Sequence, residues 1–153
     1  MKKVETLREL QLISIYIYKD LLTFCNLHKL RVYLHGGSLI GAIRHKGFIP
    51  WDDDIDVCMS RPDYEKMLNI SGGKISDYCT LIDPEADKNF SGYIPVVVYN
   101  KSKLESRQYR TEEDLKIGIS IFVFDGISSN FFKQKSYYTY MFILRAEHAL
   151  CRA

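Results

Sequence analysis

Four aspartates fall within five positions of the chain, between residues 52 and 56. If this segment is a strand, the side chains of Asp54 and Asp56 point to the same side, about 6.6 Å apart along the backbone, and Asp52 joins them if the strand begins early. Carboxylate oxygens are the ligands that Mg²⁺ and Mn²⁺ prefer, and two such ions can clamp the attacking and leaving oxygens of a phosphoryl transfer. The spacing therefore predicts that Asp52, Asp54 and Asp56 hold a divalent metal.

The alternative interpretation of these acids is a solvated strand face, with Ile55 and Val57 packed inward on the other side. An isolated Asp-x-Asp pattern favours that alternative, because charged residues on a strand are usually solvated. Four crowded carboxylates repel one another, however, and a bound cation would offset the repulsion. The crowding favours the metal site.

A second group of residues, Gly36-Gly37-Ser38, suits the binding of phosphate. Glycines let the backbone approach a ligand closely, and the free amides at a helix N-terminus attract phosphate oxygens. Taken alone, such a turn is more often simple geometry. Arg44 and Lys46 belong to a basic triplet that can neutralise a phosphate, although such triplets usually lie on a solvated helix end.

Three further residues of reactive types are interpreted as structural. His28 and His35 have no acidic partner at metal-ligand spacing. Cys58 shares the predicted face of Asp54 and Asp56, but a lone cysteine is usually a small core residue.

The elements that position these residues follow from the spacing of apolar side chains. Apolar residues recur at steps of three and four over residues 3–29, which predicts a long first helix, although the β-branched and aromatic run at 13–18 would also suit a strand. A short strand is expected at 31–35, followed by a helix with Ser38 as its N-cap. Alternating acidic and apolar residues predict the next strand at 52–59.

Further elements are expected after Ser60. A short helix should have Pro62 in its first turn, should turn Tyr64, Met67 and Leu68 inward, and should end at residues 71–73. The remaining expected elements are strands at 78–82, 93–99 and 117–124, a loop or hairpin at 101–114, and a helix at 131–152.

The bulk composition bounds the class of protein. A chain of 153 residues suits one domain, and a net charge of +2 argues against a nucleic-acid partner, because such binders are usually strongly basic. Four widely separated cysteines fit the reduced thiols of a cytosolic protein. Neither a signal peptide nor a transmembrane segment is expected. The predicted location is therefore cytoplasmic, with peripheral attachment at the inner membrane face as the alternative.

The stretch 35–57 resembles the signature of the LicD family. It contains Gly-Gly-Ser at 36–38, Arg-His-Lys at 44–46 and Pro-Trp-Asp-Asp-Asp-Ile-Asp at 50–56. The similarity covers residues 20–70 and 117–126, with the motif core at 31–70. It implies one domain over residues 1–153, of the α+β class, with a nucleotidyltransferase-like mixed β-sheet flanked by helices and a long N-terminal helix.

The resemblance also implies a function. Bacterial members of the family move phosphocholine from CDP-choline onto sugars of teichoic acid or lipopolysaccharide, and the related fukutin-related proteins move ribitol phosphate from CDP-ribitol. For this chain it implies a Mg²⁺- or Mn²⁺-dependent phosphotransferase with a CDP-linked donor and a surface glycan as acceptor. Asp52, Asp54 and Asp56 would be the catalytic, metal-binding residues. The donor's phosphates would contact Gly36, Gly37, Ser38, Arg44 and Lys46.

Two departures from the family pattern bear on activity. Where the later block of the family usually reads Asp-Ile-Phe-Pro-Leu-Asp-Gly, this chain has Ser120 in place of the first Asp and Val123 in place of the Pro. Asp125 has the opposite strand parity and would need a bulge to replace the missing acid. The family also usually continues well past residue 153. The alternative to an active enzyme is therefore a truncated, non-catalytic remnant that keeps nucleotide binding or depends on a partner.

Overall fold

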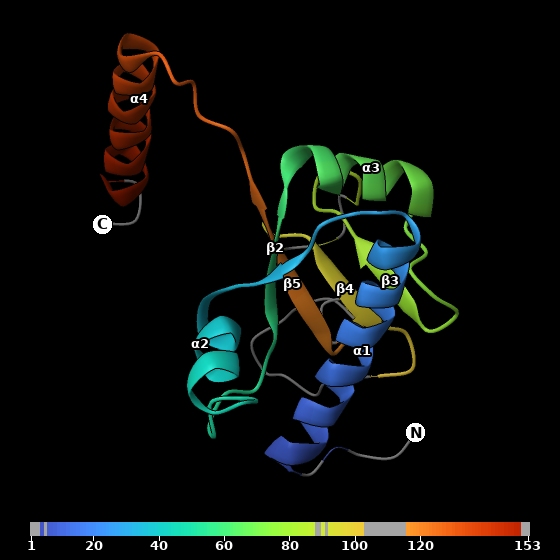
Figure 1. Ribbon diagram of the computed structural model, residues 1–153. Coiled ribbons are helices and arrows are strands. Elements are labelled where there is room, and N and C mark those ends of the chain that lie inside the picture. The colour runs from blue at the N-terminus through green and yellow to red at the C-terminus, as the bar shows by residue number, and fades with distance from the viewer. Residues whose placement is uncertain (1–3, 5, 88–89, 91, 103–115, 151–153) are drawn as a thin grey trace.

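The computed structural model of the chain describes residues 4, 6–87, 90, 92–102 and 116–150. Its strands form one five-stranded sheet in the order β1-β2-β5-β4-β3 (Figure 1). Strands β2 and β5 run parallel, and the other neighbouring pairs are antiparallel, so the sheet is mixed. The strands are β1 (Tyr33–Leu34), β2 (Asp56–Ser60), β3 (Cys79–Ile82), β4 (Val96–Tyr99) and β5 (Gly118–Phe124).

Two helices, α1 (Leu7–Leu27) and α3 (Arg61–Ser71), supply most of the core residues that pack on one face of the sheet (Figure 1). The strands contribute alternate side chains to this core, since successive residues of a strand point to opposite faces. From β2 and β5 these are Val57, Met59, Ile119 and Ile121. The other face of the same two strands carries Asp56, Cys58, Ser120 and Phe122, which are only half-buried. That face is where the candidate site lies.

Helix α1 confirms the predicted long first helix, and the strand alternative at 13–18 is wrong. A capping box starts the helix: the Thr6 hydroxyl accepts a hydrogen bond from the Glu9 amide, and the Glu9 carboxylate accepts one from the Thr6 amide. Ile17, Leu21 and Cys25 are fully buried. Their spacing of four residues makes a single buried stripe.

Helix α2 (Gly36–Arg44) begins earlier than expected. Its N-cap is His35, and Ser38 lies in the first turn, so the prediction of Ser38 as the N-cap is wrong. The physical reason is that the Ser38 hydroxyl has another partner: it accepts a hydrogen bond from the Asp56 backbone amide at 2.9 Å. The helix is thereby tied to the strand that follows it.

Strand β2 begins later than expected, at Asp56, because the segment before it forms a turn. The Asp52 amide donates to the Ile49 carbonyl at 3.0 Å, and the Asp52 carbonyl accepts from the Gln11 side chain at 2.8 Å. Pairing with β1 and β5 holds the chain only from residues 55 and 56 onward. Asp52 and Asp54 therefore precede the strand, and the predicted strand start at residue 52 is wrong.

The remaining elements agree with expectation. Helix α3 buries Tyr64 and Met67 and ends at a left-handed Gly72, whose φ is 53°. The predicted strands at 78–82, 93–99 and 117–124 are confirmed over shorter ranges as β3, β4 and β5. The predicted loop or hairpin at 101–114 lies mostly outside the described residues.

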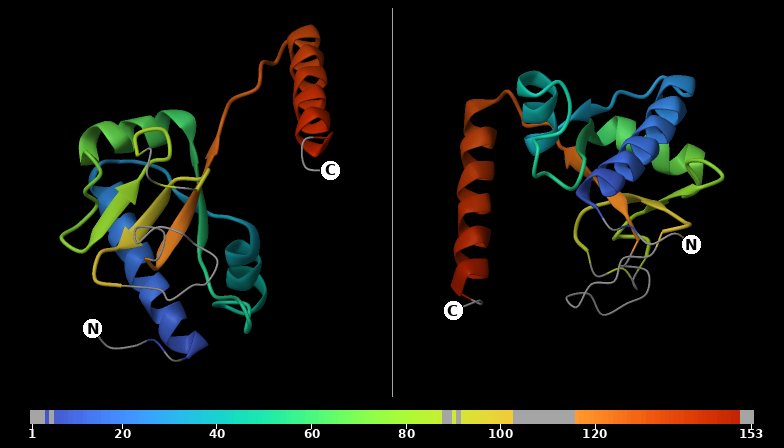
Figure 2. Two further views of the ribbon diagram at one scale, coloured as in Figure 1. Left: turned by 180° about the vertical axis from the view of Figure 1, so that it is seen from behind. Right: turned by 90° about the horizontal axis from the view of Figure 1, so that it is seen from below.

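Helix α4 (Phe131–Leu150) confirms the last predicted helix and stands away from the sheet (Figure 2). Between residues 131 and 146, every side chain except Gln134 and Met141 is exposed. None of the helices in the described part of the chain is both long and apolar enough to cross a membrane.

Candidate active site

Three carboxylates lie close together in the segment just before β2. Asp52, Asp53 and Asp54 each offer a ligand oxygen, and these oxygens lie within 4.8 Å of one another. The side chain of Gln11 on α1 fixes this turn through its hydrogen bond to the Asp52 carbonyl. Asp53 was not among the predicted ligands. It joins the group because residues 52–54 precede the paired part of β2, so the side chains need not alternate between two sheet faces.

The glycine pair at the start of α2 lies directly against these acids. A Cβ atom built on Gly37 would lie 2.8 Å from Asp52 Oδ2, and one built on Gly36 would lie 3.7 Å from Asp56 Oδ2. Gly36 also has a φ of 53°, which favours glycine. The absence of side chains at these two positions leaves room for the carboxylates beside the first turn of the helix.

Asp56 is held through its backbone and its side chain. Its carbonyl accepts a hydrogen bond from the His35 amide at 2.9 Å, and its amide donates to Ser38 as described above. In the parallel β2–β5 pair its partner position is Ser120, whose side chain opposes the rise in the pKa of the Asp56 carboxyl. Gly36 and Ser120 thus lie beside the Asp56 carboxylate, and Ser38 holds the backbone of the same residue.

The crowding of negative charge affects the pKa of two of the acids. Burial raises the pKa of Asp54, and the neighbouring charges of Asp56, Asp52 and Asp53 raise it further. Burial also raises the pKa of Asp56, while the nearby His35 opposes that rise. The negative charges of these carboxyls therefore carry an electrostatic cost, which added positive charge would reduce. A group of oxygen ligands with this electrostatic cost is chemically suited to Mg²⁺ or Mn²⁺.

The structure does not bring every predicted site residue together. Arg44 ends α2 and Lys46 follows it, so both lie at the opposite end of the helix from Gly36, about 12 Å away by helix rise. Both side chains are exposed. Lys46 lines a different, mainly apolar cavity of about 380 Å³ between α1 and α2. The role of these two cations toward a phosphate stays a prediction.

Two residues of the site were missed. His35 was interpreted as structural, yet its amide bonds to Asp56, its charge acts on the Asp56 carboxyl, and its ring centroid lies 4.8 Å from that of Phe122. No acid near His35 in the sequence indicated this, because the partner comes from a neighbouring strand. Gln11 carried a signal: together with Ser14 it continues the stripe of Ile17, Leu21 and Cys25 on α1 with polar side chains.

Asp125 does not supply the carboxylate that the family pattern usually has at position 120. It follows the end of β5, and both of its carboxylate oxygens accept hydrogen bonds from the Arg61 guanidinium, at 2.8 and 2.9 Å. The Arg61 charge holds the pKa of Asp125 below its usual range. Its carboxylate is therefore committed to an ion pair beyond the far end of the strand.

An α+β domain in which a Gly-Gly turn opens a helix against acids at the start of the next strand is a nucleotidyltransferase-type domain. The chain belongs to the LicD/FKTN/FKRP family, whose nucleotidyltransferase domain profile matches residues 29–149.

Curated relatives match shorter parts of the chain. The chain is 53% identical over 70 residues to the lipopolysaccharide cholinephosphotransferase LicD of Haemophilus influenzae. These 70 residues are 46% of this chain and 26% of the relative. The chain is 34% identical over 56 residues to an uncharacterized protein of Rickettsia typhi, covering 36% of this chain and 18% of that protein. A similar match to a protein of Rickettsia prowazekii has 35% identity over 52 residues, or 33% and 20% of the two chains. The matches span about a quarter or less of these relatives.

Proposed function

We propose that the chain binds the donor in a phosphotransferase that moves phosphocholine, or a related polyol phosphate, from a CDP-linked donor to a hydroxyl of a cell-surface glycan. One observation carries the proposal: the first turn of α2, at Gly36 and Gly37, lies directly against the carboxylates of Asp52 and Asp56. Helix N-termini attract phosphate, and carboxylates attract divalent metal, so a metal-bound diphosphate matches both. The similarity to a cholinephosphotransferase acting on lipopolysaccharide supports this choice of substrates.

Asp52, Asp54 and Asp56 are the proposed ligands of Mg²⁺ or Mn²⁺. The raised pKa values of Asp54 and Asp56 support this assignment, because a dication would offset both the burial and the repulsion between carboxylates that raise them. When bound, the metal would neutralise negative charge on the donor's phosphates. Ser38 accepts a hydrogen bond from the Asp56 amide, which leaves its own hydroxyl proton to donate to a phosphate oxygen.

The reaction is a substitution at phosphorus. The glycan hydroxyl oxygen forms a bond to the phosphorus that carries the head group, the bond from that phosphorus to CMP breaks, and CMP leaves with the electron pair. The hydroxyl proton passes to a base or to water. The protein contributes chiefly by positioning the donor and by balancing its charge.

A second candidate function is nucleotide binding without turnover, and Ser120 is the observation that favours it. A serine opposite Asp56 supplies neither a third metal ligand nor a general base at neutral pH. The donor-binding geometry at Gly37 and Asp52 does not depend on Ser120.

Calorimetry with CDP-choline, CDP-ribitol and GDP-mannose in the presence of Mg²⁺ tests the proposal. We expect a CDP-linked compound to bind at least about tenfold more tightly than GDP-mannose, which corresponds to about 1.4 kcal/mol. Asp54→Ala should remove the metal-dependent part of the binding. Equal binding of all three compounds, or tightest binding of GDP-mannose, would contradict the proposal. Tight binding of CDP-choline without CMP release in the presence of a glycan acceptor would favour the second candidate.

A further inference from the structure

The cavity of about 380 Å³ between α1 and α2 has a mainly apolar wall, whose side chains come from both helices, from β1 and from the segment after α2. Ile55 is the buried residue of this wall. The other apolar and aromatic side chains are only half-buried, so part of each faces the cavity without a covering group: Ile15, Tyr18, Leu34, Ala42 and Phe48. Such a wall favours an apolar occupant, because covering these side chains removes apolar surface from water.

Gly41 allows the segment after α2 to close this cavity. A Cβ atom built on Gly41 would lie 2.6 Å from the Gly47 carbonyl oxygen and 2.9 Å from the Ile49 amide nitrogen. Only a glycine lets the returning backbone approach the helix this closely. The close approach brings Phe48 into the cavity wall, and it fixes the side of α2 that faces the returning segment.

The charge beside the cavity is positive. Among the described residues that line it, Lys46 is the charged one, and its side chain is exposed. Arg44 adds a second exposed cation at the end of α2 that is remote from Gly36. Residues 36–51 contain no acid. An occupant with an apolar chain and an anionic end therefore matches both the wall and the charge.

The outward side of α2 continues the apolar surface beyond the cavity. Leu39 is 44% exposed and Ile43 is 64% exposed. Each lies two positions from Gly41, and therefore about 160° around the helix from the side that packs on the returning segment. A small molecule inside the cavity would leave these two side chains in water, whereas an extended apolar surface would cover them. The acids at 52–54 follow the returning segment, and Asp52 lies against Gly37, so they are not on this outward side.

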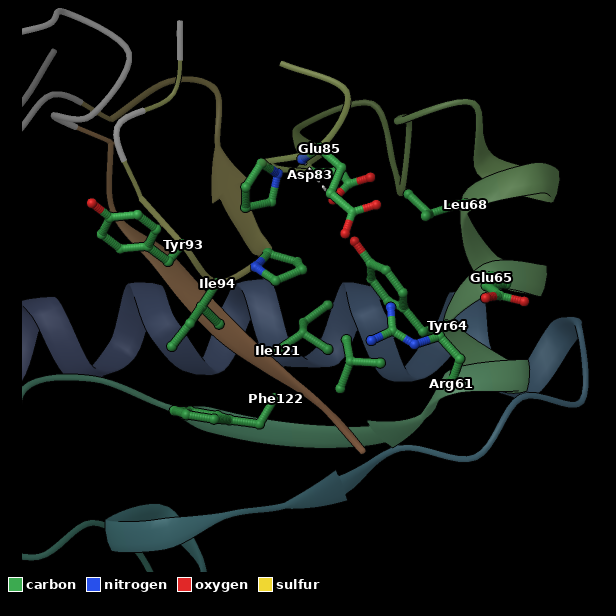
Figure 3. Close-up of a pocket in the computed structure, with 13 residues that line it drawn as sticks. Arg61, Tyr64, Glu65, Leu68, Asp83, Glu85, Tyr93, Ile94, Ile121 and Phe122 are labelled. Carbon is green, nitrogen blue, oxygen red and sulfur yellow. Dashed lines mark hydrogen bonds between the residues drawn. The ribbon is translucent and has the colours of Figure 1, made fainter. Parts of the chain in front are cut away.

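The cavity beside α3, of about 320 Å³, has a different chemistry. Four charged side chains line it, from Arg61, Glu65, Asp83 and Glu85 (Figure 3). An apolar chain placed there would take water away from these charges, which is unfavourable. The cavity between α1 and α2 is therefore the better match for an apolar chain.

We propose that the cavity between α1 and α2 binds an acyl chain of an anionic membrane lipid. Leu39 and Ile43 contact the bilayer surface, and Arg44 and Lys46 lie beside the lipid phosphates. Apolar side chains next to Lys and Arg are typical of helices at a membrane surface, where each cation is attracted to anionic lipid. A second copy of the chain is a poorer occupant, because a two-fold contact would bring the cations of both copies toward one another. The inference goes beyond the proposed function and requires neither donor nor metal.

Sedimentation of the metal-free chain with extruded vesicles tests the inference. We expect binding to phosphatidylglycerol vesicles to be at least about tenfold tighter than binding to phosphatidylcholine vesicles, since only the former carry net negative charge. Added salt should weaken the binding. Lys46→Glu and Ile43→Asp should each weaken it by about tenfold, through lost charge attraction and lost apolar contact. Ala42→Phe should also weaken it, because the larger side chain fills the cavity.

Ile70→Asp and Lys74→Glu are the matched controls. Ile70 is an exposed apolar residue of α3, and Lys74 is an exposed cation that follows it, and both lie outside α2 and the cavity. Both variants should bind phosphatidylglycerol vesicles like the parent. Melting temperatures should establish that every variant is folded.

Four results would overturn the inference. The first is no binding to phosphatidylglycerol vesicles, or equal binding to phosphatidylcholine. The second is parent-like binding by Ala42→Phe or Ile43→Asp, which would assign the binding to another surface, such as α4. The third is binding of sodium laurate without binding of vesicles, which would assign the cavity to a free fatty acid. The last is a dimer that Ile43→Asp dissociates, because a second copy would then cover the outward side of α2.

Discussion

Ser120 lies opposite Asp56 in the parallel β2–β5 pair, and its side chain opposes the rise in the pKa of the Asp56 carboxyl. Side chains at paired positions of neighbouring strands point to the same face of a sheet. An acid at position 120 would therefore face Asp56 directly. Asp125, bound to Arg61 beyond the end of β5, is not available for that role.

Ser120→Asp should raise metal-dependent release of CMP from a CDP-linked donor by about 10² to 10⁴, the usual contribution of a positioned general base. The reason is that the new carboxylate would lie beside Asp56, where it can bind metal or accept the proton of the attacking hydroxyl. CMP release by the parent and the variant is compared at one Mg²⁺ concentration, with Asp54→Ala as the background. Brisk turnover by the parent with no gain from the new acid would show that another group supplies the function.

Metal binding should stabilise the folded protein, since the carboxylates of residues 52–56 are brought together only in the native state. At a free Mn²⁺ concentration 100-fold above Kd, the expected gain is about 2.7 kcal/mol, which raises Tm by several degrees. Thermal melting with Mn²⁺ and with EDTA measures the shift. The combined change of Asp54→Ala and Asp56→Ala should abolish it. An unchanged Tm in the parent would remove the metal from the proposed site.

Much of the fold was predictable because it depends on local pattern. The stripe of Ile17, Leu21 and Cys25 repeats at helical spacing, so α1 follows from the sequence, and the apolar runs of β4 and β5 are equally plain. The start of β2 was not predictable. Residues 52–55 alternate like a strand, but they lack a pairing strand, and a tertiary hydrogen bond from Gln11 holds Asp52 at the end of a turn.

In the candidate site, too, some features follow from the local sequence and others depend on tertiary contacts. The candidate metal ligands Asp52, Asp54 and Asp56 could be recognised from the sequence, as could the glycine pair. The ability of a carboxylate to bind a metal depends on the residue type itself. The closeness of His35 to Asp56, and the addition of Asp53, depend on how distant segments pack. Neither could be obtained from spacing along the chain.

The pH dependence of stability provides a prediction with a definite sign. The pKa values of Asp54 and Asp56 are raised in the folded protein, so the protonated carboxyls favour the folded state. Their contribution to the free energy of unfolding is fully present below the unfolded pKa of about 3.9 and is lost as the pH rises through the folded pKa values. Relative to Asp54→Asn plus Asp56→Asn, the metal-free parent should lose free energy of unfolding as the pH rises above about 4. Urea unfolding of both proteins across that range measures the difference. A difference that does not vary with pH would contradict the prediction.

Gly37→Ala tests whether Mn²⁺ affinity depends on the open space between residue 37 and the Asp52 carboxylate. The new Cβ would lie 2.8 Å from Asp52 Oδ2, so the carboxylate must move, which is possible because it is the end of a side chain. We expect Mn²⁺ affinity to fall by about tenfold, equivalent to about 1.4 kcal/mol. The metal-free protein should remain folded, since alanine favours a helix over glycine by about 1 kcal/mol.

Gly47→Ala is the matched control for this change. It makes the same substitution in the segment between α2 and the acidic turn, but its Cβ would have no neighbouring atom within 4 Å. Mn²⁺ titration of Gly37→Ala, Gly47→Ala and the parent, followed by calorimetry, separates displacement of Asp52 from a general effect of replacing glycine. If both variants bind Mn²⁺ like the parent, the Asp52 carboxylate does not ligate the metal from this position. If both lose affinity equally, the loss arises from the backbone of this segment, because a Cβ on Gly47 would not touch Asp52.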